Sequence, residues 1–157
     1  NTSRGVPIAV LNLQGRVFMP AIDCPFRAGK TLVAELAGKT PVIIIDFHAE
    51  ATSEKMALGA YLDGIVTAVL GTHTHVPTAD TRVLEGGTAY VTDVGLTGSY
   101  ESVIGMKRKP AISRFLTGLP SRFEPATQRP QISSVVIDVD EASGKARTIR
   151  RLDEPSK

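Results

Sequence analysis

The sequence predicts an α/β fold in which buried strands form an open sheet. Two apolar runs, at residues 42–47 and 65–70, are short and rich in β-branched side chains, as buried strands are. The first run is apolar on both faces, which predicts a central strand covered by helices on each side. Before it, in residues 27–39, apolar side chains recur at helical spacing. We therefore expect these strands and helices to alternate within one domain.

The first half of the chain predicts five elements. Gly38 is expected to end the first helix, and Thr52 or Ser53 to cap the second. In order, we expect a strand over residues 6–13, a helix over 27–39, a strand over 42–47, a helix from about 52 to Leu62, and a strand over 65–70.

The second half predicts two hairpins and a helix. Residues 83–84 and 89–92 flank a glycine turn, and residues 132–140 and 146–152 flank a second turn. Between them, Pro110 predicts a helix that starts near Lys109. The last strand carries three arginines, which we interpret as a solvated edge that blocks strand-to-strand aggregation: Arg147, Arg150 and Arg151.

Composition excludes several classes of protein. The 157 residues suffice for one domain with a substantial core, and no apolar run approaches the length of about 18 residues that suits a membrane helix. A net charge of +2, 5% aromatic residues and no tryptophan argue against binding to long nucleic acids. Cys24 is the only cysteine, so there is no internal disulfide, and we expect a cytoplasmic protein.

All three histidines follow predicted buried strands. His48 comes after residues 42–47, and His73 and His75 belong to a Gly-Thr-His-Thr-His-Val segment after residues 65–70. If the backbone stays extended, His73 and His75 project to the same side, as two ligands of a metal would. The end of such strands is where open α/β sheets bind ligands. We therefore favour metal or phosphate chemistry over three histidines bonded to backbone.

Three neutral imidazoles suit Zn, Mn, Fe, Co or Ni better than Mg or Ca. Oxygen donors nearby in the sequence are Asp46, Glu50, Thr72, Thr74 and Asp80. Asp46 shares a side of its strand with His48, so it either orients that imidazole or simply bonds to backbone. A zinc hydrolase with three histidine ligands is one interpretation that the sequence allows. No nucleotide-binding glycine loop and no nucleophile motif is present.

Three segments resemble one family closely: residues 46–55 (Asp-Phe-His-Ala-Glu onward), 71–76 and 87–95. Residues 10–16 and 114–123 are similar to it as well. The family is the YmdB-like branch of the calcineurin-like metallophosphoesterases, bacterial enzymes associated with hydrolysis of 2′,3′-cyclic nucleotides. The resemblance covers nearly the whole chain.

The resemblance implies a four-layer α/β sandwich of the calcineurin-like metallophosphoesterase type, with a dinuclear centre of two divalent transition-metal ions (Fe, Mn or Zn). It implies that His48 and His73 bind the second metal and His75 the first. A hydroxide held between the metals would attack the phosphorus of a cyclic nucleotide or small phosphoester. Residues expected to support the metals or the substrate loop are Asp46, Glu50, Thr72, Thr74 and Asp93.

The chain departs from the family at one point. Family members carry a Gly-Asp start, a Gly-Glu-Asn segment and a Gly-Asn-His segment, which this sequence lacks. These segments supply a bridging glutamate and the histidine expected to act as general acid. We therefore expect residues 1–157 to be the C-terminal portion of a single metallophosphoesterase domain, inactive alone and competent with an N-terminal half. The alternative is a non-catalytic binding or scaffold domain. The sequence leaves open whether the protein forms a homo-oligomer.

Overall fold

The structure is a computed structural model that describes residues 1–2 and 4–155; the domain expected over residues 1–157 also includes residues 3, 156 and 157, which lie outside this description. Its elements are, in chain order, β1 (Ile8–Gln14), α1 (Pro25–Leu36), β2 (Val42–His48), α2 (Thr52–Tyr61), β3 (Ala68–Thr72), β4 (Arg82–Val83), β5 (Ala89–Val91), β6 (Gly98–Ser99), α3 (Arg108–Thr117), β7 (Pro130–Val139) and β8 (Ala146–Pro155). The predicted α/β class, helices and both hairpins are confirmed. None of the helices in the described residues combines the length and apolarity that crossing a membrane requires.

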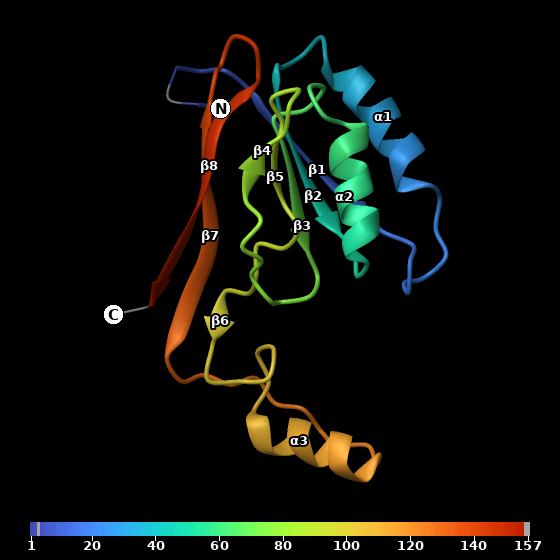
Figure 1. Cartoon of the computed structure of the whole chain (residues 1–157), viewed down its shortest axis with the longest axis vertical. Helices are drawn as coiled ribbons and strands as arrows, with labels where there is room; N and C mark the ends of the chain where they lie inside the picture. Colours follow the sequence, from blue (N-terminus) through green and yellow to red (C-terminus); the bar gives the residue numbers. More distant parts are fainter. Residues whose placement is uncertain (3, 156–157) are drawn as a thin grey trace.

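Five strands form the main sheet in the order β1-β2-β3-β5-β4. Neighbours among β1, β2, β3 and β5 are parallel, and β4 pairs antiparallel with β5. The parallel strands therefore end at one common edge, where β1, β2 and β3 finish at Gln14, His48 and Thr72. Figure 1 shows α1 and α2 side by side over one face of this sheet, with β7 and β8 on the other.

The face under α1 and α2 is closed by a continuous core. Alternate residues of β2, namely Ile43, Ile45 and Phe47, are 2%, 0% and 0% exposed and pack in one cluster with Val33 of α1 and Leu58 of α2. The expectation of helices on each side of this strand is wrong, because α1 and α2 both cover the same face. The predicted cap of α2 is wrong too: Ala51 precedes the helix, without a side-chain bond.

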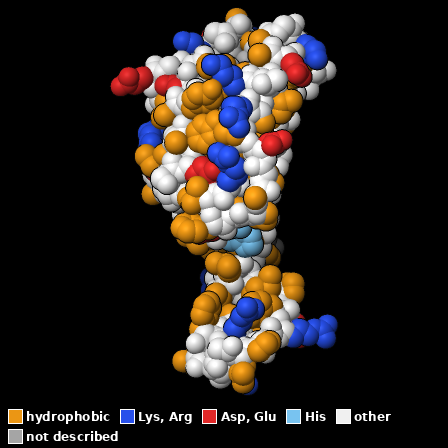
Figure 2. Space-filling view, turned by 90° about the vertical axis from the view of Figure 1, so that its right-hand side faces the viewer, with side chains coloured by type: hydrophobic (Ala, Val, Ile, Leu, Met, Phe, Trp, Pro, Cys, Tyr) orange, Lys and Arg blue, Asp and Glu red, His pale blue; other side chains and the backbone are white. Residues whose placement is uncertain are grey.

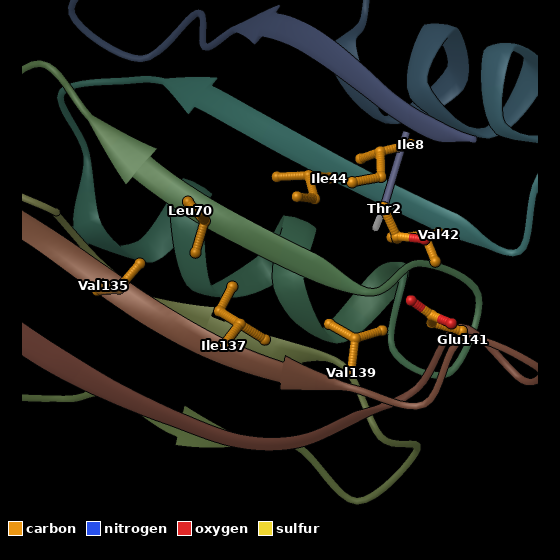
Figure 3. A pocket seen from close by; sticks show the side chains of 9 residues that line it. All are labelled: Thr2, Ile8, Val42, Ile44, Leu70, Val135, Ile137, Val139 and Glu141. Atoms are coloured by element: carbon orange, nitrogen blue, oxygen red, sulfur yellow. The ribbon is translucent and has the colours of Figure 1, made fainter. Parts of the chain in front are cut away.

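The other face is covered in part by the β7–β8 hairpin, which with β6 forms a second sheet. Val135, Ile137 and Val139 of β7 point toward Ile44 and Leu70 of the main sheet (Figure 3). A groove of about 440 Å³ remains between the two sheets. At its side, on the same face, Val10 of β1 is 66% exposed. This face is therefore apolar but open.

Residues 100–129, here called the α3 lobe, project from the body beyond the sheet (Figure 1). The helix begins at Arg108, close to the predicted start, and Pro110 lies in its first turn. Proline is tolerated there because the first N–H groups of a helix have no partner within it. The lobe touches the body near the carboxyl edge of the sheet, since His75 bonds to Ile104.

Candidate active site

Strand register brings polar side chains together at the carboxyl edge of the main sheet. Asn12 of β1 lies beside Asp46 of β2, and His48 of β2 lies beside Thr72 of β3. Residues paired on neighbouring strands project from the same face of a sheet, and so do residues two apart on one strand. The side chains of residues 12, 46, 48 and 72 therefore lie on one face. Asn12 donates its amide N–H to Asp46 over 2.8 Å, and the Thr72 hydroxyl donates to the other oxygen of Asp46, also over 2.8 Å.

This arrangement fixes the tautomer of His48. The Thr72 hydroxyl has a single proton, which Asp46 accepts. Its contact of 3.1 Å with Nδ1 of His48 must therefore use an N–H from the imidazole. The proton therefore lies on Nδ1, and Nε2 carries the lone pair. Of the two alternatives considered for Asp46, the orienting role therefore has a geometric basis, with Thr72 as the intermediate.

His73 lies directly against His48. Its Nδ1 is 3.0 Å from Nε2 of His48, and the two rings meet edge to face with centroids 4.8 Å apart. On its far side, Nε2 of His73 is 3.0 Å from a carboxylate oxygen of Glu50, which is half exposed. The structure therefore brings together His48, His73 and Glu50, but Glu50 contacts the nitrogen of His73 that points away from His48.

His75 lies apart from this pair and contacts the α3 lobe. Its Nδ1 is 2.9 Å from the carbonyl oxygen of Ile104. A carbonyl can only accept, so Nδ1 of His75 carries the proton and Nε2 keeps its lone pair. Histidines that bind metals characteristically donate their other ring N–H in this way. His48 and His75 thus both present Nε2 as a potential ligand.

The backbone that carries His73 and His75 is not extended, which corrects the reasoning from alternation. β3 ends at Thr72, and His73 and His75 have φ angles of 109° and 66°. Ile104, the partner of His75, also has a positive φ, 45°, which is unusual for a β-branched residue. Such conformations persist only where the surroundings enforce them, and they cluster at functional sites.

Asp93, in the loop after β5, holds residues 73–76 in place; these residues are here called the histidine loop. It accepts the backbone N–H and the hydroxyl of Thr74 over 3.0 and 2.8 Å, and Nζ of Lys55 over 2.9 Å. Lys55 and Asp93 are each 1% exposed, so this ion pair is buried. Burial raises the pKa of Asp93, but the bonds from Lys55, Thr74 and Gly95 outweigh it and hold the pKa below its usual value.

Two further contacts brace the same region. The backbone of β3 approaches the loop after β5 so closely that a Cβ on Gly71 would lie 1.7 Å from the carbonyl oxygen of Thr92, so only glycine fits there. The Arg151 guanidinium donates to the carbonyls of Thr78, Asp93 and Val94. The interpretation of Arg151 as a solvated edge is therefore wrong, while Arg147 and Arg150 are exposed as expected.

The donor set fits a transition-metal ion in part. Two imidazole nitrogens that each lie about 2.0–2.1 Å from one ion can be 3.0 Å apart, the separation between Nε2 of His48 and Nδ1 of His73. Within the described part of the chain, however, no three His, Cys, Asp or Glu side chains are arranged to hold one ion. These residues could therefore supply some, but not all, of the ligands of a metal centre.

Sequence reasoning gave no role to Asn12 or Lys55, and it placed Arg151 on a solvated edge. Asn12 was detectable in principle, because the parallel pairing of β1 with β2 places it beside Asp46. Lys55 is the fourth residue of α2, where a lysine is typically exposed to solvent. Its buried partner, Asp93, is distant in the sequence, so the ion pair could not be recognised locally. Asp80, considered as an oxygen donor, instead accepts the N–H and hydroxyl of Thr92.

Comparison with known proteins identifies a family and relatives of this chain. Residues 1–152 match the family described as YmdB-like protein. A Bacillus subtilis relative, "2′,3′-cyclic-nucleotide 2′-phosphodiesterase", is 55% identical over 150 residues, which are 96% of this chain and 57% of the relative. The chain thus spans little more than half of that protein.

Two crystal structures are also similar. A hypothetical protein from Thermus thermophilus has a TM-score of 0.88 and 42% identity, over 94% of this chain and 57% of that one. A structure described as a novel phosphatase, from Mycoplasma pneumoniae, has a TM-score of 0.83 and 37% identity, over 93% of this chain and 52% of that one. With its fold and sequence both matched, the chain belongs to the YmdB-like protein family.

Proposed function

We propose that this chain is part of a metal-dependent phosphodiesterase that hydrolyses 2′,3′-cyclic nucleotides. The observation that carries the proposal is the shared tautomer of His48 and His75, each with Nδ1–H donated within the protein and the lone pair on Nε2, where a metal could bind. The name of the Bacillus subtilis relative supports the substrate class. The proposal extends to two divalent ions (Fe, Mn or Zn) in a calcineurin-like centre.

In this proposal, His48 and His73 hold one ion and His75 holds the other. Such ions supply positive charge that offsets the charge on phosphoryl oxygens, and they lower the pKa of water so that it can attack phosphorus. Asp46 and Thr72 keep His48 in the ligating tautomer. Thr74 and Asp93 hold the loop between His73 and His75, and Glu50 orients His73 from its far side.

The proposal also includes a partner for the open face of the main sheet. The chain covers 57% of the Bacillus subtilis relative, so a protein of that length has further residues to place. The exposed Val10 and the groove lined by Ile44 and Ile137 offer an apolar face that an N-terminal half could cover. Together the two parts would form the four-layer sandwich and supply the missing metal ligands and general acid.

Hydrolysis of 2′,3′-cyclic AMP with added Mn²⁺ or Fe²⁺ tests the proposal. We expect negligible turnover by residues 1–157 alone, because a missing general acid typically costs about 10²–10⁴-fold and missing ligands add to this. Adding the N-terminal part of the Bacillus subtilis relative should restore activity. The combination of residues 1–157 with that N-terminal part is here called the restored protein. In it, His75→Ala should abolish hydrolysis, and Arg147→Ala, on an exposed strand, should leave hydrolysis unchanged.

Robust metal-dependent turnover by the isolated chain would refute the need for a second part. Turnover by the restored protein in the presence of a chelator would refute the metal assignment. Tight cyclic-nucleotide binding without hydrolysis in the restored protein would instead favour the non-catalytic binding domain.

A further inference from the structure

An apolar cleft lies where the α3 lobe meets the body. It has a volume of about 480 Å³, which is in the range of small-molecule sites. Residues that line it include His75, Ile104, Met106, Arg114, Phe115 and Phe123. Figure 2 shows hydrophobic side chains gathered over the lobe, with histidine at its junction with the body. The cleft therefore adjoins the histidine loop.

Two aromatic rings of this cleft are open to solvent. Phe115 is 83% exposed and Phe123 is 39% exposed. The Arg114 guanidinium lies over the Phe123 ring, 5.3 Å from its centroid. Aromatic rings and guanidinium planes are the groups on which proteins stack nucleobases. A flat aromatic ligand would bury apolar surface here that is otherwise exposed to water.

The charge of the lobe suits a ligand that carries phosphate. Residues 100–129 contain six basic side chains and two acidic ones: Lys107, Arg108, Lys109, Arg114, Arg122 and Arg129 against Glu101 and Glu124. The whole chain, by comparison, has a net charge of only +2. A positive field at the lobe would attract an anionic nucleotide toward the cleft.

The cleft is also within reach of the histidines proposed to act on phosphate. His75 lines the cleft and is two residues from His73, so their Cα atoms lie within about 7 Å. A ligand held at the histidines through its phosphate could therefore extend into the cleft. In a cyclic nucleotide the group joined to the phosphate through ribose is the base.

We infer that the cleft between His75 and the α3 lobe binds the nucleobase of the substrate, with Phe115 and Phe123 as the stacking surface. This inference rests on the proposed function for the substrate class. It makes Phe115 a determinant of affinity for nucleosides rather than a catalytic residue. A second copy of the chain, or another protein, could cover the same aromatic rings, and the experiment separates these cases.

The test is binding of adenosine and uridine to residues 1–157, measured by saturation-transfer NMR on the base protons. Neither probe carries phosphate, so the result is independent of hydrolysis. We expect saturation of the base protons, and about tenfold weaker binding in Phe115→Ala, because the base loses the ring on which it stacks. Phe115→Tyr should retain binding.

Leu116→Ala is the matched control, since Leu116 is the next residue of α3 and is 80% exposed but does not line the cleft. It should bind both nucleosides as the parent does. No saturation by either nucleoside, unchanged binding in Phe115→Ala, or equal loss in Leu116→Ala would overturn the inference. Nucleoside binding that depends on Phe115, together with no hydrolysis by the restored protein, would support the cleft and refute the proposed function.

Discussion

The two faces of the main sheet differ, although the same strands form both. On β2, Ile43, Ile45 and Phe47 are sealed under α1 and α2, whereas Ile44, which alternates with them, borders a groove. On β1, Leu13 is buried at 7% exposure, whereas Val10 is 66% exposed on the opposite face.

The two faces of the sheet contribute differently to stability and to the candidate site. The helix-covered face carries the larger of the two buried apolar clusters, so it supplies more of the hydrophobic free energy of folding than the open face. The open face ends, at the carboxyl edge, in Asn12, Asp46, His48 and Thr72, which bond to one another in series. Polar groups can persist there because each finds a partner within the series.

The largest expected effect is on the closed face. Phe47→Ala removes a fully buried ring, and we expect a loss of about 4 kcal/mol in the free energy of unfolding, measured by denaturant titration. Val10→Ala, on the open face, should cost less than about 0.5 kcal/mol in the same assay. Equal costs would show that the open face is covered. Adding the N-terminal part should raise the cost of Val10→Ala but not that of Phe47→Ala.

A smaller effect is expected at the ion pair that links the helix-covered side to the site. Asp93→Asn leaves the buried charge of Lys55 unpaired, which we expect to cost about 3 kcal/mol at pH 7. The double variant Lys55→Met/Asp93→Leu should recover part of this loss. If Asp93→Asn unfolds at the same denaturant concentration as the parent, the pair contributes nothing.

The pH dependence of the same pair has a definite sign. The pKa of Asp93 is lowered in the folded protein, so its stabilisation is complete above the unfolded value of about 3.9. It is lost as the pH falls through the lower, folded value. Unfolding titrations below pH 4 should therefore show a shallower dependence on pH in Asp93→Asn than in the parent.

The smallest effect concerns the open face alone. Thr72→Val removes the hydroxyl between Asp46 and His48, which we expect to cost about 1 kcal/mol and to increase the share of His48 protonated on Nε2. The ¹⁵N shifts of the imidazole report this tautomer directly. Thr78→Val removes a hydroxyl bonded to the Asp93 backbone and should leave His48 unchanged. An unaltered tautomer in Thr72→Val would remove Asp46 from the proposed site.

The local parts of the fold could be predicted from the sequence. The apolar runs that become β2 and β3, and the turns of both hairpins, carry their signal within a few residues. The order of the parallel strands then explains why His48 and Thr72 meet. What the apolar runs could not reveal was that both helices cover one face of β2, because a strand that is apolar on both faces is equally compatible with a hairpin over the second face.

The histidine loop could not be predicted because distant residues shape it. The spacing of His73 and His75 suggested an extended backbone, but Thr74 between them is bonded to Asp93, and Gly71 lies against Thr92. These partners are about twenty residues away in the sequence. The loop therefore takes left-handed backbone angles that local sequence preferences oppose.

The reach of Arg151 has a consequence for the order in which the chain assembles. Its guanidinium bonds to carbonyls at Thr78, Asp93 and Val94, which are 73, 58 and 57 residues earlier in the sequence. During synthesis the earlier residues emerge first, and closing so long a loop is slow. The carbonyls of Thr78, Asp93 and Val94 therefore gain this partner only after β8 has left the ribosome, and the main sheet can form before the loops beside the histidines are in their final shape.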